Sequence, residues 1–414
     1  MPFGFPLPEI SPETQAFFRI AYGLTLLGTL FRTLPSARRF FMSERWGGFA
    51  KSEPLVDCFQ NPVVLPFLLA FWFIAAALLT ADRMPAAASF ANLLISWYFF
   101  IWMRWRGVHR GLGAPGFLTY WLALALFLLE YSRRYAPALQ PLALFTLQLD
   151  FAVIIFSSGF YKFRAGYLQN QGMEFGLVNP QWGYWWKFYQ SLPAGHWIFK
   201  AYNQLAWSGQ IAAALLMIFP ATRFWGGALL IASFAVIVFN VRLLFLCPMV
   251  MICGLLYFAP GSPGDRLLSR FSFLSSPEIS AGPLPFLPFV NEGLKMALIL
   301  YLVILPFAHA GLFYNFYARK SLPLRFQKIL ETYTNFFGMI VWRVFSYDLV
   351  NFFVRIYRAP RTPKGERSLV SHWDRHTCLR YRHVGEAITV TSLFTTLKYY
   401  PSDDSLFRER LARQ

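Results

Sequence analysis

The sequence predicts an all-α, multi-pass integral membrane protein with a small β-rich tail. Hydrophobic residues make up 56% of the 414 residues and charged residues only 14%, whereas soluble domains carry about 25% charged residues. Apolar stretches long enough to cross a bilayer recur along the chain. After residue 345 the pattern changes to short runs rich in Val, Ile, Thr, Phe and Tyr, which is typical of strands.

About nine stretches are expected to cross the membrane as helices, because each has about 17–24 residues and suffices for the hydrocarbon core. The first begins at the helix-start pattern Ser11-Pro12-Glu13. The seventh and eighth are separated only around Asn240 and Arg242. The predicted spans are residues 14–33, 61–81, 85–104, 116–132, 143–162, 205–220, 224–241, 243–259 and 294–317.

Three regions follow from this pattern. Residues 1–320 are the predicted transmembrane helical domain. Residues 321–345 mix charged and aromatic side chains, and the stretch from 324 onward suits a helix lying at the membrane interface. Residues 346–414 form the predicted extramembrane tail, in which the Pro and Gly of RAPRTPKGER signal turns between strands.

The net charge of +18 raises the question of nucleic-acid binding. The basic residues are scattered through the connecting loops and the tail, without a basic domain or stripe. That distribution suits lipid head groups and topology signals better than a nucleic acid. The expected partners are therefore membrane lipids and a membrane protein complex, with no nucleic acid.

Ionisable residues inside predicted spans are costly and often functional. Arg19, Asp150 and Lys162 are the main examples. Arg19 is interpreted as a structural donor between helices. Asp150 and Lys162 are twelve residues apart, which is about 18 Å along a regular helix. They cannot pair directly, so each needs a partner from another segment.

The loop 163–204 is unusually aromatic for a membrane-adjacent segment. Its tryptophans and tyrosines fit either an aromatic belt at the interface or a wall around a flat, lipophilic ligand. The composition favours the belt. Under the second interpretation the predicted ligand-binding residues are Tyr167, Trp182, Trp185, Trp186 and Asp150.

The tail contains a group of potential metal ligands. His372, His376, Cys378 and His383 have the spacing H-x3-H-x-C-x4-H. This spacing matches no standard zinc finger, and on short strands these side chains would point in alternating directions. No metal site is predicted.

Several motifs resemble the HTTM superfamily, the membrane domain shared with vitamin K-dependent γ-glutamyl carboxylase. They are SPETQAFFRIAYGLTLLGTL at the start, SSGFYKFRAGYLQNQGMEF around Lys162, FNVRLLFLCPMVMICGLLYFAP, and WRVFS at 342–346. The similarity covers roughly residues 11–260. It implies the same helical membrane fold.

The resemblance also implies a role for Lys162. In the carboxylase the matching lysine is thought to respond to hydroquinone oxidation and to support proton removal, so a quinone or hydroquinone is the implied cofactor. This sequence differs from the carboxylase in two ways, and for this reason γ-carboxylation of secreted glutamates is not expected. RWRGVHRGLGAPGF stands where the carboxylase has an Asn-Asn-His element, and only about 100 residues follow the last predicted span.

Two functions fit the sequence. The first is a membrane enzyme acting on a lipophilic or quinone-linked substrate, with Lys162 as the reactive group and Arg242 or Asn240 as polarising partners. The alternative is a non-catalytic scaffold or assembly subunit that binds lipids, pigments or a membrane protein complex. A transporter is less favoured, because no inverted repeat with broken helices is visible.

The cysteines and the basic residues give opposite indications of the side of the membrane on which the C-terminal tail lies. The carboxylase has a cysteine in a context similar to LVDC at 55–58, so the resemblance suggests a Cys58–Cys378 disulfide. Such a bond would place the tail outside the cytosol. The richer set of basic residues lies on the same predicted face and would place it in the cytoplasm.

Overall fold

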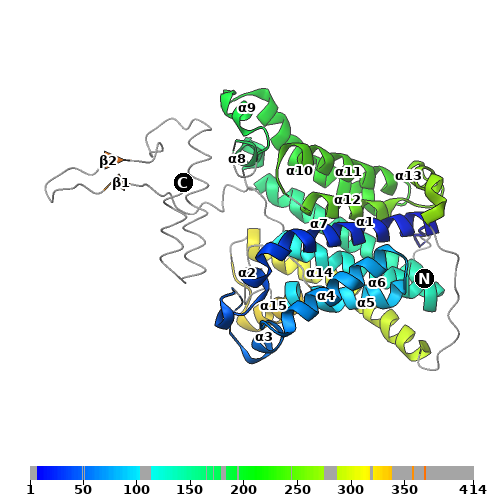
Figure 1. The fold of residues 1–414 in the computed structure, drawn as a ribbon. Helices are drawn as coiled ribbons and strands as arrows, with labels where there is room; N and C mark the ends of the chain where they lie inside the picture. Colours follow the sequence, from blue (N-terminus) through cyan, green and yellow to red (C-terminus); the bar gives the residue numbers. More distant parts are fainter. Residues whose placement is uncertain are drawn as a thin grey trace. The chain divides into compact units, whose positions relative to one another are not determined.

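The computed structural model is almost entirely helical (Figure 1). It describes residues 7–48, 50, 52–102, 113–164, 166–170, 172–178, 183–193, 195–243, 245–274, 287–317, 320–337, 357–358 and 368–369. The long helices are α1 (Pro12–Thr33), α4 (Val64–Thr80), α5 (Pro85–Trp97), α6 (Gly113–Tyr135), α7 (Gln140–Arg164), α10 (Trp197–Ile218), α11 (Arg223–Asn240), α14 (Leu287–Tyr317) and α15 (Leu324–Phe337).

Short elements connect the long helices. The α-helical ones are α2 (Ala37–Phe41), α3 (Pro54–Phe59), α8 (Met173–Leu177), α9 (Trp186–Ser191), α12 (Leu246–Gly254) and α13 (Pro263–Leu268). The 3-10 turns include η1 (Leu34–Ser36), η2 (Glu44–Trp46) and η7 (Leu255–Tyr257), and η3 (Tyr98–Trp102) is a π-helical extension of α5.

Each predicted span coincides with a helix, but fewer of these helices meet the requirements of a membrane span. Among the described residues, four segments are long and apolar enough to cross a membrane: Pro85–Trp102, Pro137–Phe163, Arg223–Asn240 and Pro288–Asn315. Val64–Thr80 and Leu246–Tyr257 are apolar but shorter. The helical fold is thus confirmed together with four candidate spans, and the count of about nine stays a prediction.

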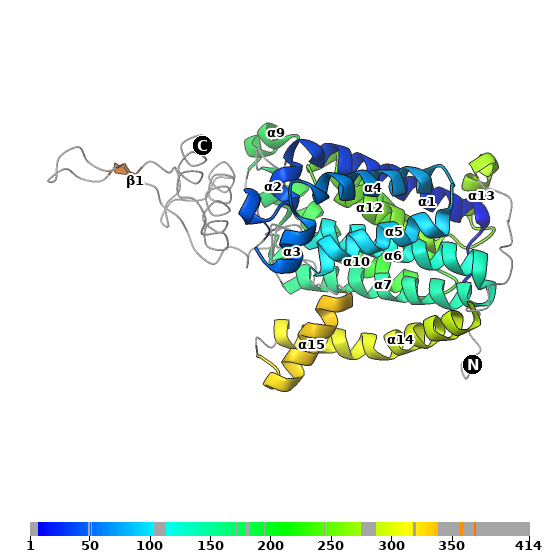
Figure 2. The ribbon, with the colours of Figure 1, turned by 60° about the horizontal axis from the view of Figure 1, so that its bottom comes forward.

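The contacts divide the chain into two units. The first comprises residues 1–157, 212–234 and 245–342, and the second comprises 158–211, 235–244 and 343–414. In the first unit α4 packs against α1 and α5, and α5 packs against α6 (Figures 1 and 2). The predicted divisions at 320 and 345 stay predictions, because residues 338–356 lie outside the described part of the chain.

A buried ion-pair network in the first unit joins α1, α6 and the turn between α4 and α5. Helix α1 begins as predicted, since the Ser11 hydroxyl accepts a hydrogen bond from the Thr14 amide at 3.1 Å and Pro12 occupies the first turn. Two turns later Arg19 is buried, with Nη1 2.7 Å from Asp82 Oδ1 and 3.6 Å from Glu130 Oε1. Removing Arg19 would leave the buried Glu130 carboxylate without its counter-charge, at a cost of about 3–5 kcal/mol.

Helix α15 lies across α14 in the first unit (Figure 2). Its inner face carries Leu330, Tyr333 and Phe337, which pack against α14 around Leu305 and Ala308. Its other side exposes Leu324, Phe326 and Ile329. A helix with large apolar side chains outside its packed face fits the predicted interfacial segment, of which residues 338–345 lie outside the described range.

The predicted β-rich tail is described only at two places. Strands β1 (Tyr357–Arg358) and β2 (Ser368–Leu369) pair antiparallel, with Tyr357 opposite Leu369. The other residues of 346–414 lie outside the described residues. A β-rich tail therefore stays a prediction.

Helices α11 and α12 approach each other closely in the first unit because glycines face each other. A Cβ atom at Gly227 would lie 2.6 Å from the Gly254 carbonyl oxygen and 3.0 Å from Tyr257 Cβ. By contrast, a Cβ atom at the exposed Gly293 of α14 would meet no atom within 4 Å.

We expect Gly227→Ala and Gly293→Ala to have opposite effects on stability. The alanine methyl group at 227 forces α11 away from α12, and such overpacking costs about 1–3 kcal/mol. At 293 it gains helix propensity of up to about 1 kcal/mol. The measurement is the thermal unfolding midpoint in detergent, and a G227A midpoint at or above that of G293A would contradict this packing.

Candidate functional site

Lys162 lies near the C-terminal end of α7 and is withdrawn from solvent. The residue is only 5% exposed. The ammonium nitrogen Nζ donates to Ser158 Oγ at 2.9 Å and to Gln210 Oε1 at 2.7 Å. Ser158 Oγ itself donates to the same Gln210 oxygen at 3.1 Å. Three buried polar side chains therefore form a closed hydrogen-bonded triangle.

The local sequence explains why these side chains meet. Ser158 and Lys162 are four residues apart on α7, so they share one face of the helix. Gln210 comes from α10 and is brought close by Gly159. A Cβ atom at Gly159 would lie 2.8 Å from Ile211 Cγ1 and 2.9 Å from the Trp207 carbonyl oxygen. The glycine thus permits the helix approach that the triangle requires.

The triangle can accommodate both protonation states of Lys162. An ammonium group has three N–H donors, of which two are taken by Ser158 and Gln210. A neutral amine has two N–H donors, which suffice for Ser158 and Gln210, and its lone pair then points to the third position. Both arrangements use the same heavy-atom positions. No carboxylate lies within ion-pair distance of Lys162 among the described residues.

The burial of Lys162 separates two interpretations of a lysine at a helix end. A snorkelling lysine extends its ammonium to the head groups, whereas this one turns inward to Gln210. The polar partners nevertheless come from α7 and α10 and not from the aromatic loop. Nearby, the Phe163 ring contacts the Trp207 ring edge-on, with centroids 5.1 Å apart.

The aromatic side chains of the loop 163–204 differ in burial and do not form one common wall among the described residues. Tyr167 is fully buried in a core cluster with Met173, Leu177 and Phe199. Trp185 is 61% exposed and donates from Nε1 to the Phe239 carbonyl oxygen at 3.0 Å. Trp186 is partly buried and lies under the Lys187 ammonium at 5.6 Å. Trp182 lies outside the described residues.

Asn240 and Arg242 hold the loop segment around α9 and make no described contact with Lys162. Asn240 Oδ1 accepts from the Tyr189 hydroxyl at 2.5 Å, and the Asn240 carbonyl oxygen accepts from the Tyr184 amide at 3.0 Å. The Arg242 guanidinium lies 5.1 Å from the centre of the Tyr184 ring. Their described contacts are therefore structural, and their role as polarising partners stays a prediction.

Asp150 belongs to the first unit and is fully engaged there. Its two carboxylate oxygens accept from Trp121 Nε1 at 2.7 Å and from the Tyr301 hydroxyl at 2.9 Å. These donors tie α7 to α6 and α14. The described contacts of Asp150 are with neutral donors, so this carboxylate joins helices, and its predicted ligand-binding role stays a prediction.

Glu174, which was not predicted from the sequence as a site residue, is buried and holds the start of α8. Glu174 Oε1 accepts from the Gly172 amide at 3.0 Å, and Oε2 accepts from Asn203 Nδ2 at 2.7 Å. Asn203 Oδ1 accepts in turn from the Met173 amide at 2.9 Å. Burial raises the pKa of Glu174 above its ordinary value of 4.5, although the Asn203 and Gly172 hydrogen bonds oppose the shift.

The remaining predicted sites fall largely outside the described residues. Cys58 is exposed and bonds to no described cysteine. Its proposed partner Cys378, and the three tail histidines, are not among the described residues. Within the described part of the chain, no group of His, Cys, Asp and Glu side chains could hold a metal ion.

Comparisons of the chain with models of protein families, with characterised proteins and with solved structures found no match. The resemblance to the HTTM superfamily therefore depends on the motifs quoted above.

We expect Glu174→Gln to flatten the pH dependence of stability. A carboxyl group whose folded-state pKa is raised stabilises the fold below its unfolded pKa of 4.5, and this contribution is lost as the pH rises through the folded-state pKa. The wild-type unfolding midpoint should therefore fall between about pH 5 and pH 8 by more than that of E174Q. The exposed control Glu9→Gln should keep the wild-type slope, and equal slopes for wild type and E174Q would refute the assignment.

Proposed function

We propose that the chain is a multi-pass integral membrane protein with about nine spans, and that it is an enzyme acting on a lipophilic, quinone-linked substrate through Lys162. The membrane location is supported by the four candidate spans and by helices at the other predicted spans. The net charge of +18 suits contact with phosphate head groups.

The observation that carries the enzymatic proposal is the buried Lys162–Ser158–Gln210 triangle. A buried ionisable group is costly, and here it is held by two neutral oxygen atoms in place of a carboxylate. The third N–H of the ammonium, or the lone pair of the neutral amine, has no partner among the described contacts. This is the position in which a substrate oxygen would bind.

The proposed chemistry is proton transfer. A neutral Lys162 donates its two N–H groups to Ser158 and Gln210 and keeps its lone pair for the third position. There it takes the proton of a hydroquinone hydroxyl and becomes an ammonium group, and dioxygen takes the electrons from the hydroquinone anion that is left. Ser158 and Gln210 keep the nitrogen oriented in both states. The resemblance around SSGFYKF supports the hydroquinone as substrate class. The rings of Phe163 and Trp207 would provide an apolar contact beside the lysine.

The second candidate function, a scaffold for a membrane complex, is favoured by a different observation. Trp185, Phe188 and Trp197 are 61%, 53% and 69% exposed. Large exposed aromatic side chains are typical of interaction surfaces and of interfacial belts. This surface would bind lipids, pigments or a partner protein without any reaction at Lys162.

Lys162→Met should abolish hydroquinone oxidation. The methionine keeps an unbranched side chain that is one atom shorter but removes the proton acceptor, so the rate should fall by about 10²-fold or more. Oxidation by air of an isoprenoid benzo- or naphthohydroquinone is followed by absorbance with the protein in nanodiscs, against protein-free discs. Lys187→Met, at an exposed lysine, is the control and should retain the wild-type rate. Equal rates for K162M and wild type would rule out this mechanism.

The scaffold function predicts a separate effect of Trp185→Ala combined with Trp197→Ala. Under this function the double variant loses the lipids, pigments or proteins that co-purify with wild type in native nanodiscs, while Trp225→Ala, at an exposed tryptophan of α11, retains them. Size-exclusion chromatography and mass spectrometry of the extracted particles provide the measurement. If the double variant keeps the same co-purifying species and the wild-type oxidation rate, the exposed aromatic residues serve only as a membrane belt.

A further inference from the structure

A largely apolar groove lies in the first unit. Its volume is about 560 Å³, within the range of roughly 300–1,000 Å³ that is typical of small-molecule sites. Segments η1 to α2 form one wall and α4 forms the other. The lining residues are apolar except for one arginine and include Leu34, Arg38, Met42, Leu69, Phe73 and Ile74.

Arg38 presents an uncompensated positive charge to this groove. Its side chain is exposed, and Nε donates to the Trp46 carbonyl oxygen at 3.3 Å. No carboxylate lies within ion-pair distance of Arg38 among the described residues. Gly47 adopts a left-handed conformation with φ of 79°, and a Cβ atom there would lie 3.7 Å from Arg38 Nη2. The Trp46 contact thus orients the guanidinium while leaving both Nη atoms free to bind an anion.

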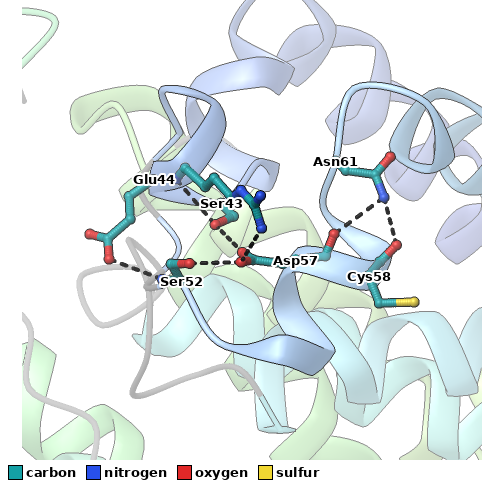
Figure 3. Close-up of polar contacts among 7 residues, drawn as sticks. Ser43, Glu44, Ser52, Asp57, Cys58 and Asn61 are labelled. Atoms are coloured by element: carbon teal, nitrogen blue, oxygen red, sulfur yellow. Dashed lines mark hydrogen bonds and ion pairs between the residues drawn. The ribbon is translucent and has the colours of Figure 1, made fainter.

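The loop that positions Arg38 is held by Asp57 (Figure 3). The carboxylate of Asp57 accepts from the Ser43 hydroxyl at 2.5 Å and from the Ser52 hydroxyl at 2.7 Å. These two hydrogen bonds lower the pKa of Asp57. Arg45 lies 3.8 Å from the same carboxylate, so its charge is already compensated. Among the described side chains of this segment, Arg38 is therefore a cation that stays available to a ligand.

The same loop places Arg38 at the N-terminal end of α4. The Ser43 amide donates to the Gln60 carbonyl oxygen at 3.0 Å. Asn61 follows, and its side-chain oxygen accepts at 2.8 Å from the amide of Val64, the first residue of α4. Figures 1 and 2 show α2 and α3 at this end of the helix. The groove continues along α4 from Leu65 to Ile74, a length of about 14 Å.

The outer surface of α4 is suited to lipid. Phe67 is 73% exposed and Phe71 is 53% exposed, on a helix that has no charged residue. If α4 lies in the membrane, its first turn lies near the head groups, and the groove extends toward the hydrocarbon region. A cation at the head-group level above an apolar groove is complementary to one class of ligand, an anionic amphiphile.

We propose that this groove is a binding site for an anionic phospholipid, with one acyl chain against Leu69 and Phe73 and the phosphate bound by Arg38. The proposal rests on the proposed membrane location of α4 and is independent of the chemistry at Lys162. The site would hold an annular lipid in a defined place beside α4.

Lipid add-back followed by native mass spectrometry tests this site. Delipidated protein in detergent receives dioleoyl phosphatidylglycerol or dioleoyl phosphatidylcholine at equal concentration. Wild type should retain more phosphatidylglycerol, and Arg38→Gln should lower that retention about tenfold to the level of phosphatidylcholine. Arg38→Lys should restore part of the preference, since it keeps the charge but loses the planar fork of donors. Arg83→Gln, at an exposed arginine in the α4–α5 turn, is the control and should match wild type.

Filling the groove separates the lipid from a free anion. Leu69→Trp should reduce retention of both lipids, and Ala70→Leu serves as a milder change if L69W lowers the unfolding midpoint. Inorganic phosphate should not displace the bound lipid; displacement by phosphate would mean that Arg38 is a simple anion site. Equal phosphatidylglycerol retention by wild type and R38Q overturns the proposal. Release of the protein from membranes by alkaline carbonate would instead contradict the membrane location on which it rests.

Discussion

The hydrogen bonds of one buried amino group, that of Lys162, join helices α7 and α10 in the second unit. In an interior without water, every N–H of Lys162 that lacks an acceptor is costly. Ser158 supplies one acceptor from the same helix, and Gln210 supplies another from α10. These contacts require α7 and α10 to pack closely, which is possible because Gly159 has no side chain between them. Helix packing, the burial of the lysine and its proposed proton transfer thus depend on the same hydrogen bonds.

The two units satisfy their buried polar groups in different ways. In the first unit the charge of Arg19 is balanced by Asp82 and Glu130, and such a network ties helices together. In the second unit Lys162 has only neutral partners among the described contacts. Balanced pairs stabilise one charge state, whereas the neutral triangle accommodates either state. This difference is the physical reason for assigning the chemistry to Lys162.

The positions of the helices could be predicted from the sequence, but the burial of individual side chains could not. Run length and the Ser11-Pro12-Glu13 pattern located the helices because both are local properties of the chain. The burial of Tyr167 and the exposure of Trp185 could not be read from composition, because both residues occur in one aromatic loop. The Lys162–Gln210 contact joins residues 48 positions apart, so only the fold identifies it. Similarly, Glu174 became recognisable only through Asn203 on α10.

A density map of the protein in lipid nanodiscs would show directly whether the Lys162 side chain is held inside the second unit. We predict that the Lys162 side chain turns into the protein, with Nζ at hydrogen-bonding distance from Ser158 Oγ and Gln210 Oε1. A lysine side chain that extends outward to the head groups, with Gln210 bonded elsewhere, would contradict the account.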